Sequence, residues 1–180
     1  FIAENAYSFS KSELGLIRDW KNHVRGNFYV YKQYKKHCVF ITDGENPRCY
    51  GVLGLESRFE EVLPHFPCYV QAVLLPFKGT IVYDAFVSSY NVSFGGELKE
   101  KMKRVYEVAK ARYGIITSLP FEVPSQLEQE KSLIRFYLKS EFNMYYYDNE
   151  LDQLLNKSEE LQETYFQEIA KINAKSYVRS

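Results

Sequence analysis

Between residues 28 and 87, short runs of aromatic and β-branched residues alternate with turn residues. Such runs are typical of β-strands, because these side chains pack well on a pleated surface. We expect strands at 28–34, 37–42, 49–55, 68–75 and 80–87. Five strands in this order form either a small, partly closed barrel of the OB or SH3-like type or an open antiparallel sheet with helices on one face.

Helix signals precede and interrupt these strands. Ser10 and Glu13 have the spacing of a capping box, and Gly26 is expected to end the helix that follows. Ser57 and Glu60 repeat the spacing ahead of a short helix between the third and fourth strands.

An amphipathic helix is predicted after Gly95-Gly96, and Gly114 is expected to end it. One face of this helix is apolar and packs on the sheet. Its residues are Leu98, Met102, Val105, Tyr106, Ala109 and Tyr113. A short strand or buried connection follows at 115–117.

Two further helices are expected near the carboxyl end. Ser125 and Glu128 begin a helix that continues to about Phe142, and a last helix runs from about Asn149 to about Ala174. Its leucines are spaced like part of a heptad seam, although fewer than three heptads are regular. A helical hairpin is the simpler interpretation.

These elements predict an α+β fold in two parts. Residues 1–119 form the sheet or barrel module with its packed amphipathic helix, and residues 120–180 form a C-terminal helical annex, a helical pair.

Charge and aromatic content restrict the partners. The net charge is zero, so nothing global attracts the chain to nucleic acid or membrane. Tyrosine, with 16 residues, and phenylalanine, with 13, are both abundant, which suits half-buried sheet faces and interfaces. The sequence Phe142 to Tyr147 contains three consecutive tyrosines, at least one of which is expected at the surface or under a partner.

The cysteines favour a reducing compartment. Cys38, Cys49 and Cys68 are odd in number and lack CxxC spacing, so we expect free thiols and a cytoplasmic protein. No apolar run approaches the roughly 20 residues that span a bilayer, so no membrane partner is expected.

The stretches YGVLGL, VLLPFKGTIVYDAFVSSYNVSFGGELK and YGIITSLP, together with the pair Lys36-His37, resemble an uncharacterised bacterial protein family of unknown function. The resemblance covers residues 20–119. It implies that these residues are the principal module, and it assigns no activity or site residue.

Basic residues and tyrosines are interleaved early in the chain. Residues 11–37 carry seven Lys/Arg and two acidic residues. Basic side chains beside stackable rings are what single-stranded nucleic acids require. The candidate nucleic-acid-binding residues are Tyr29, Tyr31, Lys32, Tyr34, Lys35 and Lys36, unless these tyrosines simply pack under a helix.

A second candidate is an anion site at the start of the amphipathic helix, formed by Gly95, Gly96 and Lys99. Exposed amides at a helix start attract anions. Glu97 and Glu100 oppose this by placing negative charge in the first turn.

Catalytic signals are weak. Asp84 and the Glu97-Leu98-Lys99 run superficially resemble a metal-dependent nuclease of the PD-(D/E)xK kind, but Glu97 begins a helix instead of lying on a paired strand. No histidine or cysteine cluster has zinc spacing, and no catalytic, metal or cofactor motif is found.

The sequence therefore favours a non-enzymatic protein-binding or regulatory module, with a protein partner or self-association. A nucleic-acid-binding domain is the first alternative. A metal-dependent hydrolase or nuclease around Asp84 and Glu97 is the second.

Overall fold

The computed structural model describes residues 8–54, 59–63, 65–84, 88–90 and 95–177. The chain divides into two compact units, here called the barrel unit (1–110 with 114–122) and the helical unit (111–113 with 123–180). Ser57, expected to begin the short helix, and 85–87, expected to end the fifth strand, lie outside the described residues.

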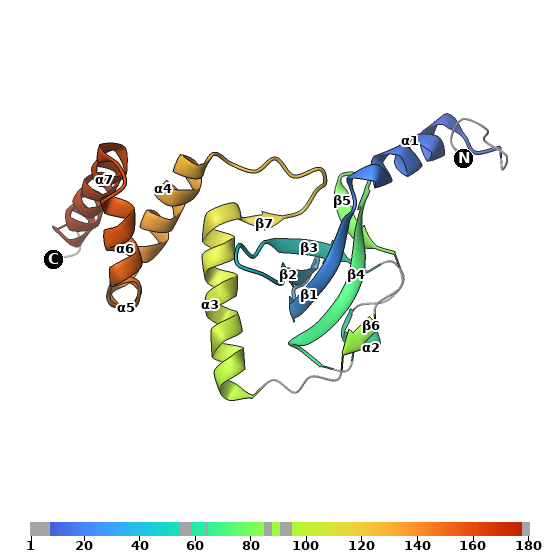
Figure 1. Cartoon of the computed structure of the whole chain (residues 1–180), viewed down its shortest axis with the longest axis horizontal. Helices are drawn as coiled ribbons and strands as arrows, with labels where there is room; N and C mark the ends of the chain where they lie inside the picture. The colour runs from blue at the N-terminus through green and yellow to red at the C-terminus, as the bar shows by residue number, and fades with distance from the viewer. Residues whose placement is uncertain (1–7, 55–58, 64, 85–87, 91–94, 178–180) are drawn as a thin grey trace. The chain divides into compact units, whose positions relative to one another are not determined.

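Five strands of the barrel unit form a closed ring (Figure 1). Around the ring the order is β1-β2-β3-β5-β4, and β4 pairs again with β1. Every neighbouring pair is antiparallel except β3 and β5, which are parallel. The strands are β1 (Val24–Gln33), β2 (Cys38–Thr42), β3 (Cys49–Leu53), β4 (Cys68–Phe77) and β5 (Thr80–Tyr83). The α+β class and the small barrel are thus confirmed.

This connectivity is that of an OB-type Greek-key barrel. The short helix α2 (Phe59–Val62) lies between β3 and β4 in the chain. Two short strands extend the sheet: β6 (Ser88–Tyr90) pairs with β4, and β7 (Ile115–Ile116) pairs with β3.

The long strand β1 closes the ring because it pairs along both of its edges. Residues 24–30 pair with β4, and residues 28–33 pair with β2. The register with β2 shifts between Val30 and Lys32, an irregularity that bends a strand and increases its twist. The bend lets one strand belong to both halves of the barrel.

Aromatic rings fill the barrel interior. Phe28, Phe40 and Phe59 are each at most 1% exposed. The ring of Phe40 meets Phe28 and Phe59 edge-on, with centroids 5.9 Å and 5.1 Å away. Such contacts add to the stabilisation from burial.

The first helix is shorter than expected. Ser10 and Glu13 form the capping box that the spacing predicted, but α1 (Lys11–Asp19) is followed by a 3-10 turn, η1 (Trp20–Asn22). The expectation that Gly26 ends the helix was wrong. Residues Val24 and Gly26 lie in β1 and pair with Leu74 and Ala72, because strand pairing overrides the local helical spacing.

The amphipathic helix α3 (Gly96–Tyr113) is confirmed. Gly114 follows it with φ 73°, a left-handed conformation that favours glycine. Met102, Tyr106 and Ala109 are buried on its apolar face.

The three cysteines are free thiols buried in the barrel unit. Cys38 and Cys68 belong to the interior cluster, and Cys49 faces α3. Burial raises the pKa of Cys49 to about 12 and that of Cys68 to about 11. It also raises the pKa of Cys38.

The helical unit contains α4 (Gln126–Tyr137), α5 (Glu141–Tyr146), α6 (Asp148–Leu155) and α7 (Glu159–Tyr177). The helical annex is therefore present, but each of the two expected helices is interrupted. The side chains of Ser140 and Ser158 accept hydrogen bonds from the amides of Asn143 and Leu161, at 3.1 Å and 3.3 Å. Serine thus caps a new helix where continuous helix was expected.

An ion pair joins the largely buried Glu130 of α4 to Lys157, whose side chain is 51% exposed in the turn between α6 and α7. Lys157 Nζ lies 2.6 Å from Oε1 of Glu130, which also accepts a hydrogen bond from Gln126 at 2.8 Å. Burial alone would raise the pKa of Glu130, but the hydrogen bonds from Lys157 and Gln126 outweigh it and hold the pKa below its ordinary value. None of the described helices is both long and apolar enough to cross a membrane.

The barrel core generates the first prediction. Phe40→Ala should lower the free energy of unfolding by about 3–5 kcal/mol, because it leaves a cavity between two buried rings. Val62→Ala, at a residue that is 51% exposed, is the control and should lower it by less than about 1 kcal/mol. Urea unfolding followed by circular dichroism measures both; equal losses would contradict the assignment of the core.

The ion pair of Lys157 with the largely buried Glu130 generates a second prediction. Lys157→Met should destabilise the helical unit by about 1–3 kcal/mol at neutral pH, because the Glu130 carboxylate loses its charged donor. Lys171→Met is the control, since Lys171 pairs with Glu168 at the surface, and should cost less than about 1 kcal/mol.

The pH dependence of Lys157→Met follows from the lowered pKa of Glu130. The pair stabilises the fold above the ordinary carboxyl pKa of about 4.3. That stabilisation is lost as the pH falls through the lowered pKa of the folded state. The loss caused by Lys157→Met should therefore shrink on acidification, and a loss that grows would contradict it.

Candidate functional site

Helix α3 packs on the outer face of β1, β2 and β3. The buried strand residues there are Val39, Ile41 and Cys49, and their partners on α3 are Met102, Tyr106 and Ala109. Because α3 covers the outer face of β2 and the barrel interior lies against its inner face, consecutive residues of β2 are buried on both faces. In OB-type barrels the face of strands 2 and 3 is where oligonucleotides and oligosaccharides bind. In this chain α3 occupies the centre of that face.

The tyrosines predicted to stack on bases lie around the edge of α3. The Tyr31 ring stacks on Tyr106 with centroids 4.9 Å apart, and the Tyr34 hydroxyl lies 3.1 Å from that of Tyr106. Tyr29 lies against Tyr69, with centroids 4.8 Å apart. All three candidate tyrosines are half-buried. Burial is the main reason that the pKa of Tyr106 is raised, and the Tyr34 hydrogen bond adds to it.

The predicted lysines lie apart from this packing. Lys32, Lys35 and Lys36 are exposed at the end of β1 and in the connection to β2. Lys32 Nζ lies 5.5 Å from the Tyr34 ring centroid. Nucleic-acid binding at this place stays a prediction, and the lysines offer phosphate contacts more readily than the tyrosines offer stacking.

That hypothesis has a direct test. Replacing Lys32, Lys35 and Lys36 together by Glu should weaken binding to a labelled single-stranded oligonucleotide at low salt at least tenfold. Loss of three phosphate contacts should also reduce the salt slope by about 2. Lys78→Glu, at an exposed residue in the β4–β5 turn, is the control. Fluorescence anisotropy that detects no binding by the unchanged chain at low salt would dispose of the hypothesis.

The predicted anion site lies at the exposed start of α3. Gly95 is the N-cap, Gly96 is the first helical residue, and Lys99 is exposed. The Lys99 amide donates a 3.1 Å hydrogen bond to the Gly95 carbonyl, the first bond of the helix. Glu97 lies in the first turn and already complements the helix dipole. An anion site here stays a prediction.

The carboxylates of the nuclease hypothesis come from separate elements. Asp84 directly follows β5, where its amide donates to the Val73 carbonyl at 3.1 Å. Glu97 is exposed on α3. Among the described residues, no group of three or more His, Cys, Asp or Glu is placed to hold a metal ion. The hydrolase hypothesis therefore gains no geometric support.

His37 has a structural setting. Its ring lies against the backbone of Gly51, where a Cβ would come within 3.1 Å of the ring. Burial lowers the pKa of His37. Glycine at position 51 thus makes room for the imidazole beside β3.

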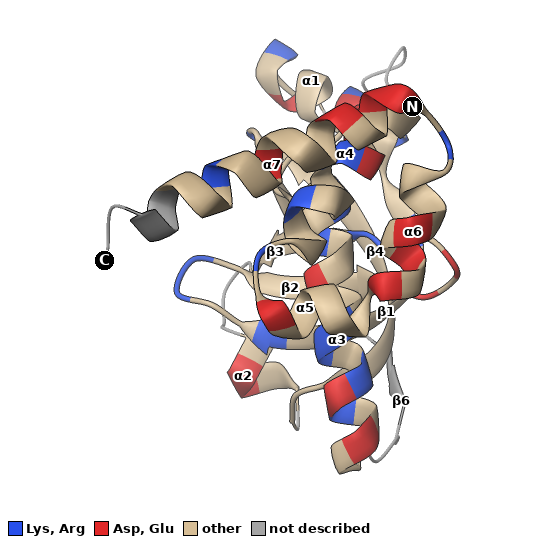
Figure 2. Cartoon of the chain, turned by 90° about the vertical axis from the view of Figure 1, so that its left-hand side faces the viewer, with Lys and Arg blue, Asp and Glu red and all other residues tan. Residues whose placement is uncertain are grey.

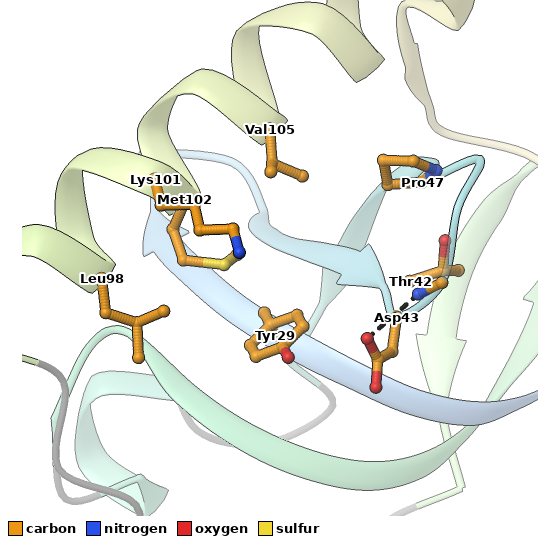
Figure 3. Close-up of a pocket in the computed structure, with 9 residues that line it drawn as sticks. Tyr29, Thr42, Asp43, Pro47, Leu98, Lys101, Met102 and Val105 are labelled. Carbon is orange, nitrogen blue, oxygen red and sulfur yellow. Dashed lines mark hydrogen bonds between the residues drawn. The ribbon is translucent and has the colours of Figure 1, made fainter.

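A cavity of about 220 Å³ lies between the first half of α3 and the β2–β3 turn (Figure 3). Its apolar walls include Leu98 and Val105 of α3 and Pro47 of the turn. Tyr29 lies below them, and Lys101 and Asp43 face the hollow from opposite sides. No local pattern in the sequence predicts this cavity, because a helix and a turn far apart in the chain create it.

The Asp43 carboxylate is held in place by donors. Tyr69 donates its hydroxyl to Oδ2 at 2.7 Å, and the Gly44 amide donates to Oδ1 at 3.0 Å. The Tyr69 hydrogen bond to Asp43 is the main reason that the pKa of Tyr69 is raised to about 12. Burial, and then Asp43, raises the pKa of Tyr29. These hydrogen bonds fix the Asp43 carboxylate at the edge of the cavity.

The helical unit carries an exposed aromatic cluster, here called the α5 patch. It consists of Phe142, Tyr145 and Tyr146, which are 63%, 86% and 44% exposed. Tyr147 is buried, with its ring stacked on Tyr137 at 4.6 Å. The expectation that one of the three consecutive tyrosines lies at the surface agrees with this arrangement.

Acidic residues accompany the α5 patch. Between 140 and 156 the chain has no lysine or arginine, and its acidic residues are Glu141, Asp148, Glu150 and Asp152. All four are exposed, and Figure 2 colours the acidic positions of the helices red. The patch therefore combines aromatic rings with negative charge.

No protein-family model, curated protein or solved structure matches the chain. The candidate surfaces are the α3-covered barrel face, the cavity beside it, and the α5 patch.

Proposed function

We propose that the chain is a non-enzymatic protein-binding module, and that the α5 patch binds a basic segment of a partner protein. The observation that carries this proposal is the exposure of three aromatic rings on one six-residue helix. Large rings are enriched in protein interfaces and supply most of the contact energy when a partner buries them.

The three rings lie on one side of α5. Positions 142, 145 and 146 are three and four residues apart, the spacing at which helical side chains are neighbours. The Phe142 and Tyr146 rings stack with centroids 5.8 Å apart. A partner can therefore contact all three at once.

Charge indicates what kind of partner fits. Lysine and arginine bind favourably over tyrosine rings, and the exposed carboxylates of α5 and α6 attract the same side chains. Two copies pairing through their α5 patches would bring these carboxylates together, which is unfavourable. The patch therefore suits a lysine- or arginine-rich segment that also carries apolar side chains.

The test uses a fluorescent amphipathic peptide of lysine and leucine, with a matched peptide in which glutamate replaces lysine. The full chain should bind the lysine peptide, with affinity that falls as salt rises. Phe142→Ala combined with Tyr145→Ala should weaken binding at least tenfold, because truncating two central rings removes about 1.4 kcal/mol or more.

Phe166→Ala is the control, since this ring is 66% exposed on α7 outside the patch. Anisotropy that is equal for both peptides, or unchanged by the double variant, would contradict the proposal. Self-association of the chain alone that Tyr145→Ala abolishes would assign the patch to a second copy instead. Sedimentation velocity measures that outcome.

A further inference from the structure

We infer that the cavity between α3 and the β2–β3 turn is a binding site for a free amino acid with an apolar side chain. This ligand is a small zwitterion. The site is separate from the α5 patch and does not depend on the function proposed for it.

The size of the cavity limits the ligand. Its volume of about 220 Å³ equals that of about seven water molecules at ~30 Å³ each. Cavities for drug-sized ligands usually begin at about 300 Å³. A single amino acid fits this space, whereas a nucleotide or an oligosaccharide would extend beyond it.

The charges define the polar end of the ligand. Asp43 and Lys101 are the charged residues that line the cavity, and they face it from opposite sides (Figure 3). The described ion pairs include no bridge between them. An α-ammonium group is complementary to Asp43, and an α-carboxylate is complementary to Lys101.

The Asp43 carboxylate is a fixed acceptor for a ligand cation. Tyr69 and Gly44 hold the carboxylate through hydrogen bonds, but neither neutralises its charge. The Tyr29 ring also lines the cavity, and aromatic rings attract cations. Preorganised acceptors of this kind bind an ammonium group without rearranging.

The remaining walls define the apolar end. Leu98, Met102 and Val105 come from α3, and Pro47 comes from the turn. A branched or thioether side chain buries its surface against these residues. The complete site thus offers a carboxylate to the ammonium group of an apolar amino acid, an ammonium group to its carboxylate, and an apolar wall to its side chain.

The test pairs ligand analogues with variants of the full chain. L-leucine, leucinamide and N-acetyl-leucine are titrated into isotope-labelled protein, and NMR chemical-shift changes give each Kd. Leucinamide lacks the carboxylate, and N-acetyl-leucine lacks the ammonium group. Each should bind the unchanged chain about fivefold more weakly than leucine, the effect of one exposed ion pair.

The variants assign each charge to its partner. In Lys101→Gln, leucine and leucinamide should bind equally, while N-acetyl-leucine remains weaker. In Asp43→Asn, the discrimination against N-acetyl-leucine should disappear instead. Lys103→Gln is the matched control, because Lys103 is an exposed lysine of α3 that does not line the cavity.

Shift changes should cluster on the lining residues, and Val105→Phe, which fills the cavity, should abolish them. A peptide amino terminus lacks the adjacent carboxylate, so Leu-Gly-Gly should behave like leucinamide. Tighter binding of that peptide would overturn the assignment to a free amino acid. Equal binding of all three analogues, or no binding of leucine by the unchanged chain, would overturn the site itself. Thermal melting of each variant shows that it is folded.

Discussion

The two-sided pairing of β1 is the constraint on which the barrel unit depends. One ten-residue strand supplies partners to both β2 and β4, and the irregularity after Val30 lets it turn from one to the other. Closure then makes two distinct surfaces. The inner surface buries Phe28, Phe40 and Phe59. The outer surface must be covered by another part of the chain or remain in contact with water.

Helix α3 covers the outer surface that OB-type barrels commonly offer to ligands. It does so with apolar residues and with Tyr106, which contacts both Tyr31 and Tyr34. At the margin of the covered face, α3 and the β2–β3 turn leave a cavity. In the helical unit, by contrast, the α5 patch leaves the rings of Phe142 and Tyr145 largely exposed.

Local signals in the sequence predicted most of the fold. Serines 10 and 125 begin helices, Gly114 ends one, and the five strands lie where aromatic and β-branched residues gather. The parallel β3–β5 pair had no local signal, because it depends on the closure of the whole ring. The cavity depends on the same long-range packing. The candidate tyrosines were found by composition, yet only the packing of α3 decides how much of each ring is exposed.

The three cysteines have a practical consequence. Their thiols are buried, and raised pKa values keep them protonated at neutral pH, so they react slowly with alkylating reagents and oxidants. The resident thiols of the unchanged chain should therefore react little during site-directed labelling. One cysteine introduced on the surface would take up a maleimide dye far faster than the resident thiols, which would become reactive only when the barrel opens.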